Sequence, residues 1–361
     1  MTDMKSSIAI KKSCVAIEDC RFALVFALAL GTGAALAQDA DDVIGDAQIH
    51  AERGLQAAEV FPGYASLCDL DMTFRNVNVL ATDPPRPRNP TAQSSANSAA
   101  TQRTQRPSAP PPARVFDNLF FVGSQSVSSW LLGTEDGYIL IDAMNSDEEA
   151  ETIIEAGIVS LGLDPAKVEY LLITHAHGDH FGGYNYISDT WSPRIVMSET
   201  DWDLASRLAE HPRFGLPPAK DYSVSDGDQL TAGSTTLDIR VTPGHTPGTI
   251  SPVFTVYDNG TPYRAVLWGG TGFNFGPNYE QMASYAASAN RMKQLAVEEN
   301  VQVFFSNHSR RDGSLERIGE LAGREPGDPH PFVQGEELYV VFDVLEQCAL
   351  AQAARIREGD Y

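Results

Sequence analysis

The hydrophobic positions along the chain predict short buried strands that alternate with amphipathic helices. Continuous apolar runs are typical of strands buried on both faces, whereas apolar spacings of three and four residues are typical of helices. On this pattern we expect strands at residues 115–122, 130–132, 138–141, 168–174, 194–197, 235–241, 253–257, 265–268 and 301–305, and helices at residues 148–161, 200–210, 279–299 and 335–357. Strands interleaved with helices indicate layered sheets that are covered by helices.

The residues before this pattern divide into three segments. Residues 1–37 have the features of a secretory signal peptide, because basic residues precede an apolar run at residues 22–30 and a small-residue cleavage site follows at residues 35–37. A misassigned start or an uncleaved anchor would give the same pattern. Residues 38–81 are expected to form an N-terminal segment with a short amphipathic helix, and residues 82–113, rich in Pro, Ser and Thr, a flexible linker.

The charge of the chain limits its partners. The formal net charge is -22, from 48 acidic and 26 basic residues. A field of this sign repels phosphate backbones and anionic membrane surfaces. We therefore expect no nucleic-acid partner and, after cleavage of the signal, no membrane partner, although a charge that serves solubility alone would look the same.

Two of the four cysteines remain after the expected signal is removed. Cys68 and Cys348 are an even pair in an exported chain, so a disulfide bond between them is permitted. Two buried free thiols are the alternative. A disulfide would tie the N-terminal segment to the last predicted helix.

A cluster of possible metal ligands follows directly on the strand predicted at residues 168–174. His175, His177, Asp179 and His180 lie within six residues of one another. In a turn that leaves a strand, the first two can face one point and the last two a neighbouring point. Imidazole nitrogens and carboxylate oxygens suit zinc, so the segment predicts a metal site.

Two further histidines lie in loops that also follow predicted strands. His245 stands in the turn-rich segment TPGHTPG, and His308 follows Asn307. Each by itself is compatible with a structural role, but together with the first segment they complete two sets of three ligands. The remaining histidines, His50, His211 and His330, have no ligand pattern and are expected on the surface.

These motifs resemble the metallo-β-lactamase superfamily over residues 114–357. The resemblance implies an α/β fold, a four-layered αββα sandwich, with residues 114–361 as the catalytic domain. By position, it implies a first zinc ion on His175, His177 and His245. It implies a second zinc ion on Asp179, His180 and His308.

Two positions of the sequence make it most similar to B3, the third subclass of the metallo-β-lactamases. Gly270 stands where glyoxalase II-like thioesterases and lactonases place a bridging aspartate, and Thr271 falls near the position of the cysteine ligand of other lactamase subclasses. The resemblance thus implies a zinc β-lactamase with a role in antibiotic resistance, which opens a β-lactam amide with a zinc-bound hydroxide that Asp179 orients. Another hydrolase of cyclic esters, lactones or thioesters is the alternative, as is a zinc-binding protein without turnover.

One departure concerns the substrate. Subclass B3 often carries two serines that bind the substrate carboxylate, and Thr271 and Phe273 stand at the corresponding positions. A threonine hydroxyl can donate a hydrogen bond but a phenylalanine cannot. Thr271 and Asn274 are therefore the candidate substrate-binding residues, with Ser309 as a further possibility. The expected partner is a small-molecule β-lactam or other cyclic amide or ester, and the expected location is secreted or periplasmic.

A supporting carboxylate is also expected, because metal-bound histidines usually donate their second N–H to a carboxylate or carbonyl. Asp142 follows the strand predicted at residues 138–141 and is a candidate. An aspartate that merely forms a turn at the end of that strand is equally consistent with the sequence.

Overall fold

The computed structural model describes residues 46–84 and 109–361. The signal peptide predicted at residues 1–37 and most of the linker predicted at residues 82–113 lie outside the described residues. The strands are β1 (Ala113–Phe116), β2 (Leu119–Phe121), β3 (Trp130–Gly133), β4 (Tyr138–Ile141), β5 (Val168–Leu172), β6 (Arg194–Ser198), β7 (Tyr222–Val224), β8 (Gln229–Ala232), β9 (Thr235–Asp238), β10 (Val253–Asp258), β11 (Thr261–Trp268) and β12 (Val301–Ser306).

Helices lie between β4 and β5, β5 and β6, β6 and β7, and β11 and β12, and they also precede β1 and follow β12. They are α2 (Ala47–Ala57), α4 (Asp147–Glu149), α5 (Ala156–Ser160), α6 (Gly178–Phe181), α7 (Tyr184–Trp191), α8 (Glu199–Arg207), α9 (Tyr279–Glu298), α10 (Ser309–Asp312), α11 (Ser314–Ala322) and α12 (Val340–Glu358), with the 3-10 turns η1 (Pro62–Cys68), η4 (Pro165–Lys167) and η5 (Gly335–Tyr339) and the π-helical turn η3 (Ala150–Glu155). No helix of the described part is both long and apolar enough to cross a membrane.

The strands form two sheets. The first has the order β1-β2-β3-β4-β5-β6-β7, and the second has the order β12-β11-β10-β9-β8. Strands β4, β5, β6 and β7 run parallel, and so do β11 and β12. Parallel neighbours end at the same edge of a sheet, so the loops that follow β4, β5 and β6 start side by side, as do the loops that follow β11 and β12.

Alternation along the strands produces three hydrophobic cores, as a four-layered sandwich requires. In β4, Ile139 and Ile141 face a core that both sheets share, whereas Leu140 faces a core with the helices between β4 and β7. In β12, Phe305 faces the shared core and Phe304 faces a third core with α2, α9 and α12. The predicted αββα architecture is therefore confirmed.

One predicted strand is wrong in detail. Residues 115–122 form a hairpin of β1 and β2, in which Phe116 pairs with Leu119 across Asp117 and Asn118. Asp and Asn are residues that favour tight turns, because their side chains can bond to nearby backbone. The continuous apolar pattern on both sides of this polar pair concealed the turn.

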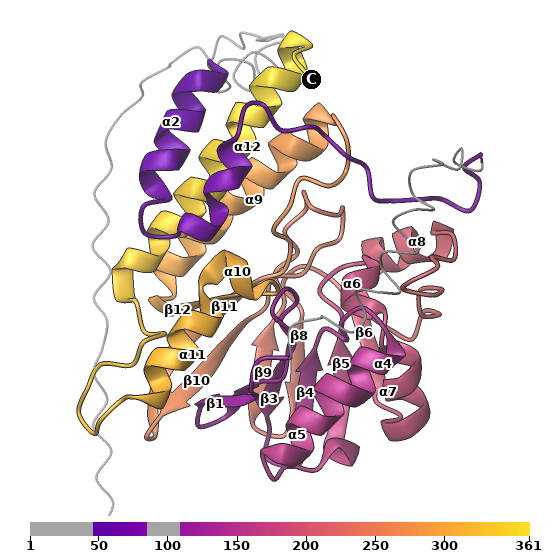
Figure 1. Ribbon diagram of the computed structural model, residues 1–361, viewed down its shortest axis with the longest axis vertical. Helices are drawn as coiled ribbons and strands as arrows, with labels where there is room; N and C mark the ends of the chain where they lie inside the picture. Colours follow the sequence, from indigo (N-terminus) through magenta and orange to yellow (C-terminus); the bar gives the residue numbers. More distant parts are fainter. Residues whose placement is uncertain (1–45, 85–108) are drawn as a thin grey trace, which may run out of the picture. The chain divides into compact units, whose positions relative to one another are not determined.

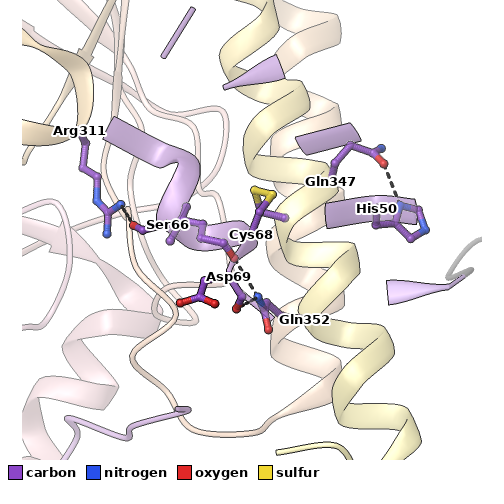
Figure 2. Close-up of a disulfide and its surroundings, with 9 residues drawn as sticks. His50, Ser66, Cys68, Asp69, Arg311, Gln347 and Gln352 are labelled. Atoms are coloured by element: carbon purple, nitrogen blue, oxygen red, sulfur yellow. Dashed lines mark hydrogen bonds between the residues drawn. A yellow bond between two sulfur atoms is a disulfide. The ribbon is translucent and has the colours of Figure 1, made fainter. Parts of the chain in front are cut away.

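The N-terminal segment packs against the C-terminal helix. Helices α2 and α12 lie side by side (Figure 1) and contact each other along their lengths. The predicted bond between Cys68 and Cys348 is present and joins η1 to α12, as Figure 2 shows. Beside it, the Gln352 amide donates hydrogen bonds to the carbonyls of Leu67 and Asp69, at 2.9 and 3.0 Å. Both contacts fix the chain just before it leaves toward residues 75–81.

Candidate metal centre

The loop after β5 carries the densest group of candidate ligands. His175 and His177 follow the end of the strand, and α6 begins at Gly178, so that Asp179 and His180 lie on its first turn. A β-carbon at Gly178 would lie 2.2 Å from the ring of Phe214. The close approach of this ring explains why glycine stands here, between the two pairs of ligands.

The first cluster contains His175, His177 and His245, all buried. The Nε2 atom of His245 lies 3.0 Å from Nε2 of His175 and 3.0 Å from Nδ1 of His177. The Nε2 atom of His177 is buried without a hydrogen-bond partner. Side chains from two distant loops thus converge on a single point.

Neighbouring groups fix the tautomers of two of these rings. His245 Nδ1 donates a hydrogen bond to the carbonyl of Gly272 at 2.5 Å. The Thr174 hydroxyl donates to Asp142, so it accepts from Nδ1 of His175 at 3.1 Å. With both Nδ1 atoms protonated, the Nε2 lone pairs of His175 and His245 face each other, an arrangement that a cation between them stabilises.

The second cluster contains Asp179, His180 and His308. The Asp179 carboxylate lies 3.6 Å from Nε2 of His180 and 3.8 Å from Nε2 of His308. His180 Nδ1 donates to Asp142 at 2.7 Å, and His308 Nδ1 donates to the carbonyl of Ser126 at 2.7 Å. Because both Nδ1 atoms are engaged, the Nε2 atoms of His180 and His308 remain beside the Asp179 carboxylate as possible ligands. Both clusters therefore fit a cation by the chemistry of their atoms.

Burial keeps the first cluster neutral. It lowers the pKa of His175 and His245 well below 6.5 and lowers the pKa of His177 to about 4. A neutral imidazole is the form that binds metal. No proton therefore has to be displaced from these three rings at neutral pH.

The second cluster is electrostatically different. Burial lowers the pKa of His180, but the carboxylates of Asp142 and Asp179 outweigh this effect and raise it. Burial raises the pKa of Asp179, but the adjacent His180, His308 and His177 hold it well below its usual range. Asp179 is thus an anion whose side chain is 30% exposed, enough to face solvent as well as the histidines.

Asp142 supports both clusters from behind. It is fully buried, accepts from the backbone N–H and hydroxyl of Thr174 at 2.7 and 2.9 Å, and accepts from His180. Its backbone has a φ of 65°, a left-handed conformation that aspartate tolerates better than most residues. Of the two interpretations that the sequence left open, the structure favours the supporting carboxylate over a simple turn residue.

Sequence reasoning missed two buried aspartates that hold the loops together. Asp201 on α8 accepts from the N–H groups of Ala176 and Gly248 and from the Thr246 hydroxyl, at 2.7 to 2.8 Å. It therefore links the loop of His175 to the loop of His245. Asp312 accepts from the N–H groups of Ser306 and Ser314 at 2.7 and 2.9 Å and closes the loop that carries His308. Burial raises the pKa of each to about 6.

A cavity of about 770 Å³ opens onto the centre. Its lining includes His177 and Asp179 from the segment after β5, which we call the metal loop (residues 175–180), and Asn274 from the loop after β11. Thr271 is buried and is not among the lining residues, so the structure brings Asn274 but not Thr271 to the cavity. The Ser309 hydroxyl is buried and donates to the carbonyl of Ser124 at 3.3 Å.

Two histidines predicted on the surface are buried, so that prediction is wrong for them. His50 bonds to Gln347 at 2.8 Å, and His330 bonds to the carbonyl of Val115 at 2.9 Å while its ring stacks on Phe116. Each has a polar partner in a distant part of the chain, which no local pattern signals. His211 is exposed, as predicted.

Comparisons with known proteins agree with this geometry. Residues 122–257 match the family model of the Metallo-beta-lactamase superfamily. The structure is similar to BJP-1, a subclass B3 metallo-beta-lactamase of Bradyrhizobium japonicum, with 25% identity and a TM-score of 0.60 over 70% of this chain and 97% of that chain. The chain is 24% identical over 215 residues to an N-acyl homoserine lactonase of Bacillus thuringiensis, covering 51% of this chain and 82% of the relative. It is 26% identical over 195 residues to a hydroxyacylglutathione hydrolase of Rhodopseudomonas palustris (strain BisA53), covering 54% of this chain and 68% of the relative.

The chain therefore carries a domain of the metallo-β-lactamase superfamily, a class of metal-binding hydrolases, as its histidine motifs predict. Solved structures similar to it include metallo-β-lactamases of subclass B3. The relatives bear the names of different activities, so the superfamily defines a hydrolase of small molecules without defining its substrate.

Proposed function

We propose that this protein is an exported zinc hydrolase that binds two metal ions and opens the amide of a β-lactam. The observation that carries the proposal is the pair of ligand clusters, which bring together five histidines and a single carboxylate. Histidine nitrogens with one carboxylate suit zinc better than the oxygen-seeking Mg²⁺ or Ca²⁺. The first ion would lie on His175, His177 and His245, and the second on Asp179, His180 and His308.

Gly270 favours a β-lactam over the substrates of the thioesterase and lactonase branches. Those branches place an aspartate between their metal ions, and Gly270 stands at that position in this sequence. A β-carbon here would lie 2.5 Å from the β-carbon of His245. An aspartate would therefore displace a metal ligand, and the site in this chain is built without a bridging carboxylate.

When bound, the metal ions would polarise the substrate carbonyl and make a coordinated water acidic. The protein's own groups supply position and charge. Asp142 fixes His180 in the orientation that leaves its Nε2 free, and Asp201 holds the loops of His175 and His245 together. The partly exposed Asp179 lines the cavity, where its carboxylate can accept a hydrogen bond from the attacking water and orient it.

Export to a secreted or periplasmic location is part of the proposal. The bond between Cys68 and Cys348 supports it, because disulfides persist in oxidising compartments. The segment at residues 1–37 supports it through its sequence alone. N-terminal sequencing of the protein recovered from the export compartment should find residue 38 as the first residue, and an intact N-terminus on a cytoplasmic protein would refute this part.

Substrate profiling tests the hydrolase proposal. Residues 38–361, loaded with zinc, should turn over a penicillin, a cephalosporin or a carbapenem, should lose this activity to a chelator, and should contain about two zinc ions per chain. An N-acyl homoserine lactone is the matched comparison, since a lactonase is among the relatives. Turnover of the lactone with no turnover of any β-lactam would move the function to the ester-hydrolase alternative, and a protein that binds no metal would overturn the proposal.

A further inference from the structure

Residues 75–81 form a strap across the mouth of the metal cavity. At one end, Val77 donates to the carbonyl of Asn274 at 2.8 Å and Gly276 donates to the carbonyl of Arg75 at 3.0 Å. At the other end, Ala81 donates to the carbonyl of Arg207 at 2.8 Å and Ala209 to the carbonyl of Val79 at 2.8 Å. The strap, as we call residues 75–81, is thus fixed by backbone hydrogen bonds to the loop after β11 and to the end of α8.

The strap supplies one wall of the cavity that the metal loop also lines. Val77 and Val79 give this wall apolar surface, and Leu208 and Phe214 continue it on the neighbouring loop. Val77 is 48% exposed, so its side chain is accessible to a molecule in the cavity. The wall is therefore suited to the apolar part of a small molecule.

Arg75 gives the same wall a positive charge. It is the single arginine or lysine among the described residues that line the cavity. Its side chain is exposed, and its guanidinium has no carboxylate partner within the described parts of the chain. A planar guanidinium can bind a carboxylate through two parallel hydrogen bonds.

The two positions that correspond to the carboxylate-binding serines of subclass B3, Thr271 and Phe273, do not reach the cavity. Phe273 is buried, and its ring packs against Tyr285 with centroids 4.9 Å apart. Thr271 is buried as well. Asn274 does line the cavity, but its amide is neutral. The positive side chain in the lining is Arg75, which the strap supplies from a part of the chain far away in sequence.

We propose that the strap is the substrate-recognition wall of the metal cavity and that Arg75 receives the carboxylate of the substrate. The inference rests on the proposed function in one respect, that the cavity takes a carboxylate-bearing cyclic amide. The apolar substituent of the substrate lies against Val77, Val79 and Phe214. Because Cys68 fixes the chain seven positions before Arg75, the disulfide limits how far the strap can move.

The test compares benzylpenicillin with its methyl ester, which lacks the carboxylate charge. In the zinc-loaded protein, Arg75→Gln should raise KM for benzylpenicillin about two- to fivefold, as expected for an exposed charged contact, with kcat unchanged. KM for the methyl ester should stay unchanged. Arg75→Lys should recover part of the loss, because it keeps the charge and loses the paired geometry.

Arg53→Gln is the matched control, because Arg53 is an exposed arginine on α2 outside the cavity lining. It should behave as the wild type with both compounds. Equal effects of Arg75→Gln on acid and ester, or no effect on either, would overturn the assignment.

The inference and the proposed function fail in different ways. If the wild type hydrolyses neither benzylpenicillin nor its methyl ester, the two compounds stay intact during the experiment. Their binding to the zinc-loaded protein can then be measured by calorimetry. If Arg75→Gln then binds benzylpenicillin more weakly than the wild type does, the role of the strap in substrate recognition is supported while the β-lactamase proposal fails. No binding of benzylpenicillin to the wild type would overturn the strap as well.

Discussion

Removal of the Asp201 carboxylate should loosen the metal centre without touching a ligand. Asp201→Ala would leave the buried N–H groups of Ala176 and Gly248 without their acceptor, whereas the Thr246 hydroxyl keeps the Thr249 hydroxyl as a partner at 2.7 Å. Each orphaned donor costs roughly 1–3 kcal/mol. Losing the buried carboxylate offsets about 3 kcal/mol of this, which corresponds to a pKa raised from 3.8 to about 6. The two orphaned N–H groups together cost about 2–6 kcal/mol, so we expect the free energy of unfolding to fall by up to about 3 kcal/mol.

The assay is urea denaturation of the zinc-loaded protein, followed by tryptophan fluorescence, with metal content measured on the same samples. Asp203→Ala is the matched control, because Asp203 lies two positions away on α8 and is exposed. It should change the free energy of unfolding by less than about 0.5 kcal/mol. In Asp201→Ala the first cluster should also bind zinc more weakly, since its two loops are no longer tied. The reasoning is refuted if both variants unfold at the same urea concentration and retain the same metal.

Three further predictions address other contacts. Replacing Cys68 and Cys348 together by serine should lower the free energy of unfolding by about 2–5 kcal/mol. A reducing agent should destabilise the wild type by the same amount and leave the variant unchanged. A variant as stable as the oxidised wild type would contradict this prediction. Asp142→Asn should weaken zinc at the second cluster roughly 10–100-fold, because His180 loses the acceptor that orients it; competition with a chromophoric chelator measures this, and unchanged affinity would argue against the supporting role. Burial raises the pKa of Asp201 above its unfolded value, so its contribution to stability is present at low pH and is lost as the pH rises through about 6. The wild type should therefore gain about 1 kcal/mol relative to Asp201→Asn between pH 7 and pH 5, and a difference that is constant across these pH values would refute the shift.

Local patterns predicted most elements because each element buries one or both faces. The continuous apolar run before His175 is β5 with its following residues, and the helix predicted at residues 279–299 is α9, which ends one residue earlier. The short strands β7 and β8 were not predicted, since β8 buries only Leu230 and Ala232 between exposed polar residues. A strand of four residues that pairs at the edge of a sheet has too few apolar positions to stand out from a loop.

The candidate ligands could be predicted from the sequence because they are residue types that bind metal and they stand directly after predicted strands. Four of the six lie within one short segment, and all six follow predicted strands, where loops of neighbouring strands meet. Asp201 and Arg75 carried no such signal. An aspartate near the start of a helix and an arginine in an irregular segment are ordinary surface residues by sequence, and their roles depend on what the fold places against them.

The sequence by itself indicated the superfamily, the two candidate ligand sets and the possible partner of Cys68, because these depend on residue type and on order along the chain. The tertiary structure alone decided which groups orient the ligands and what forms the wall of the cavity. Asp142 reaches His180 from the end of another strand, and the strap crosses from one loop to another through backbone hydrogen bonds that carry no sequence signature. Contacts of this kind depend on packing between distant segments, and the pattern of a single segment contains no information about its neighbours in space.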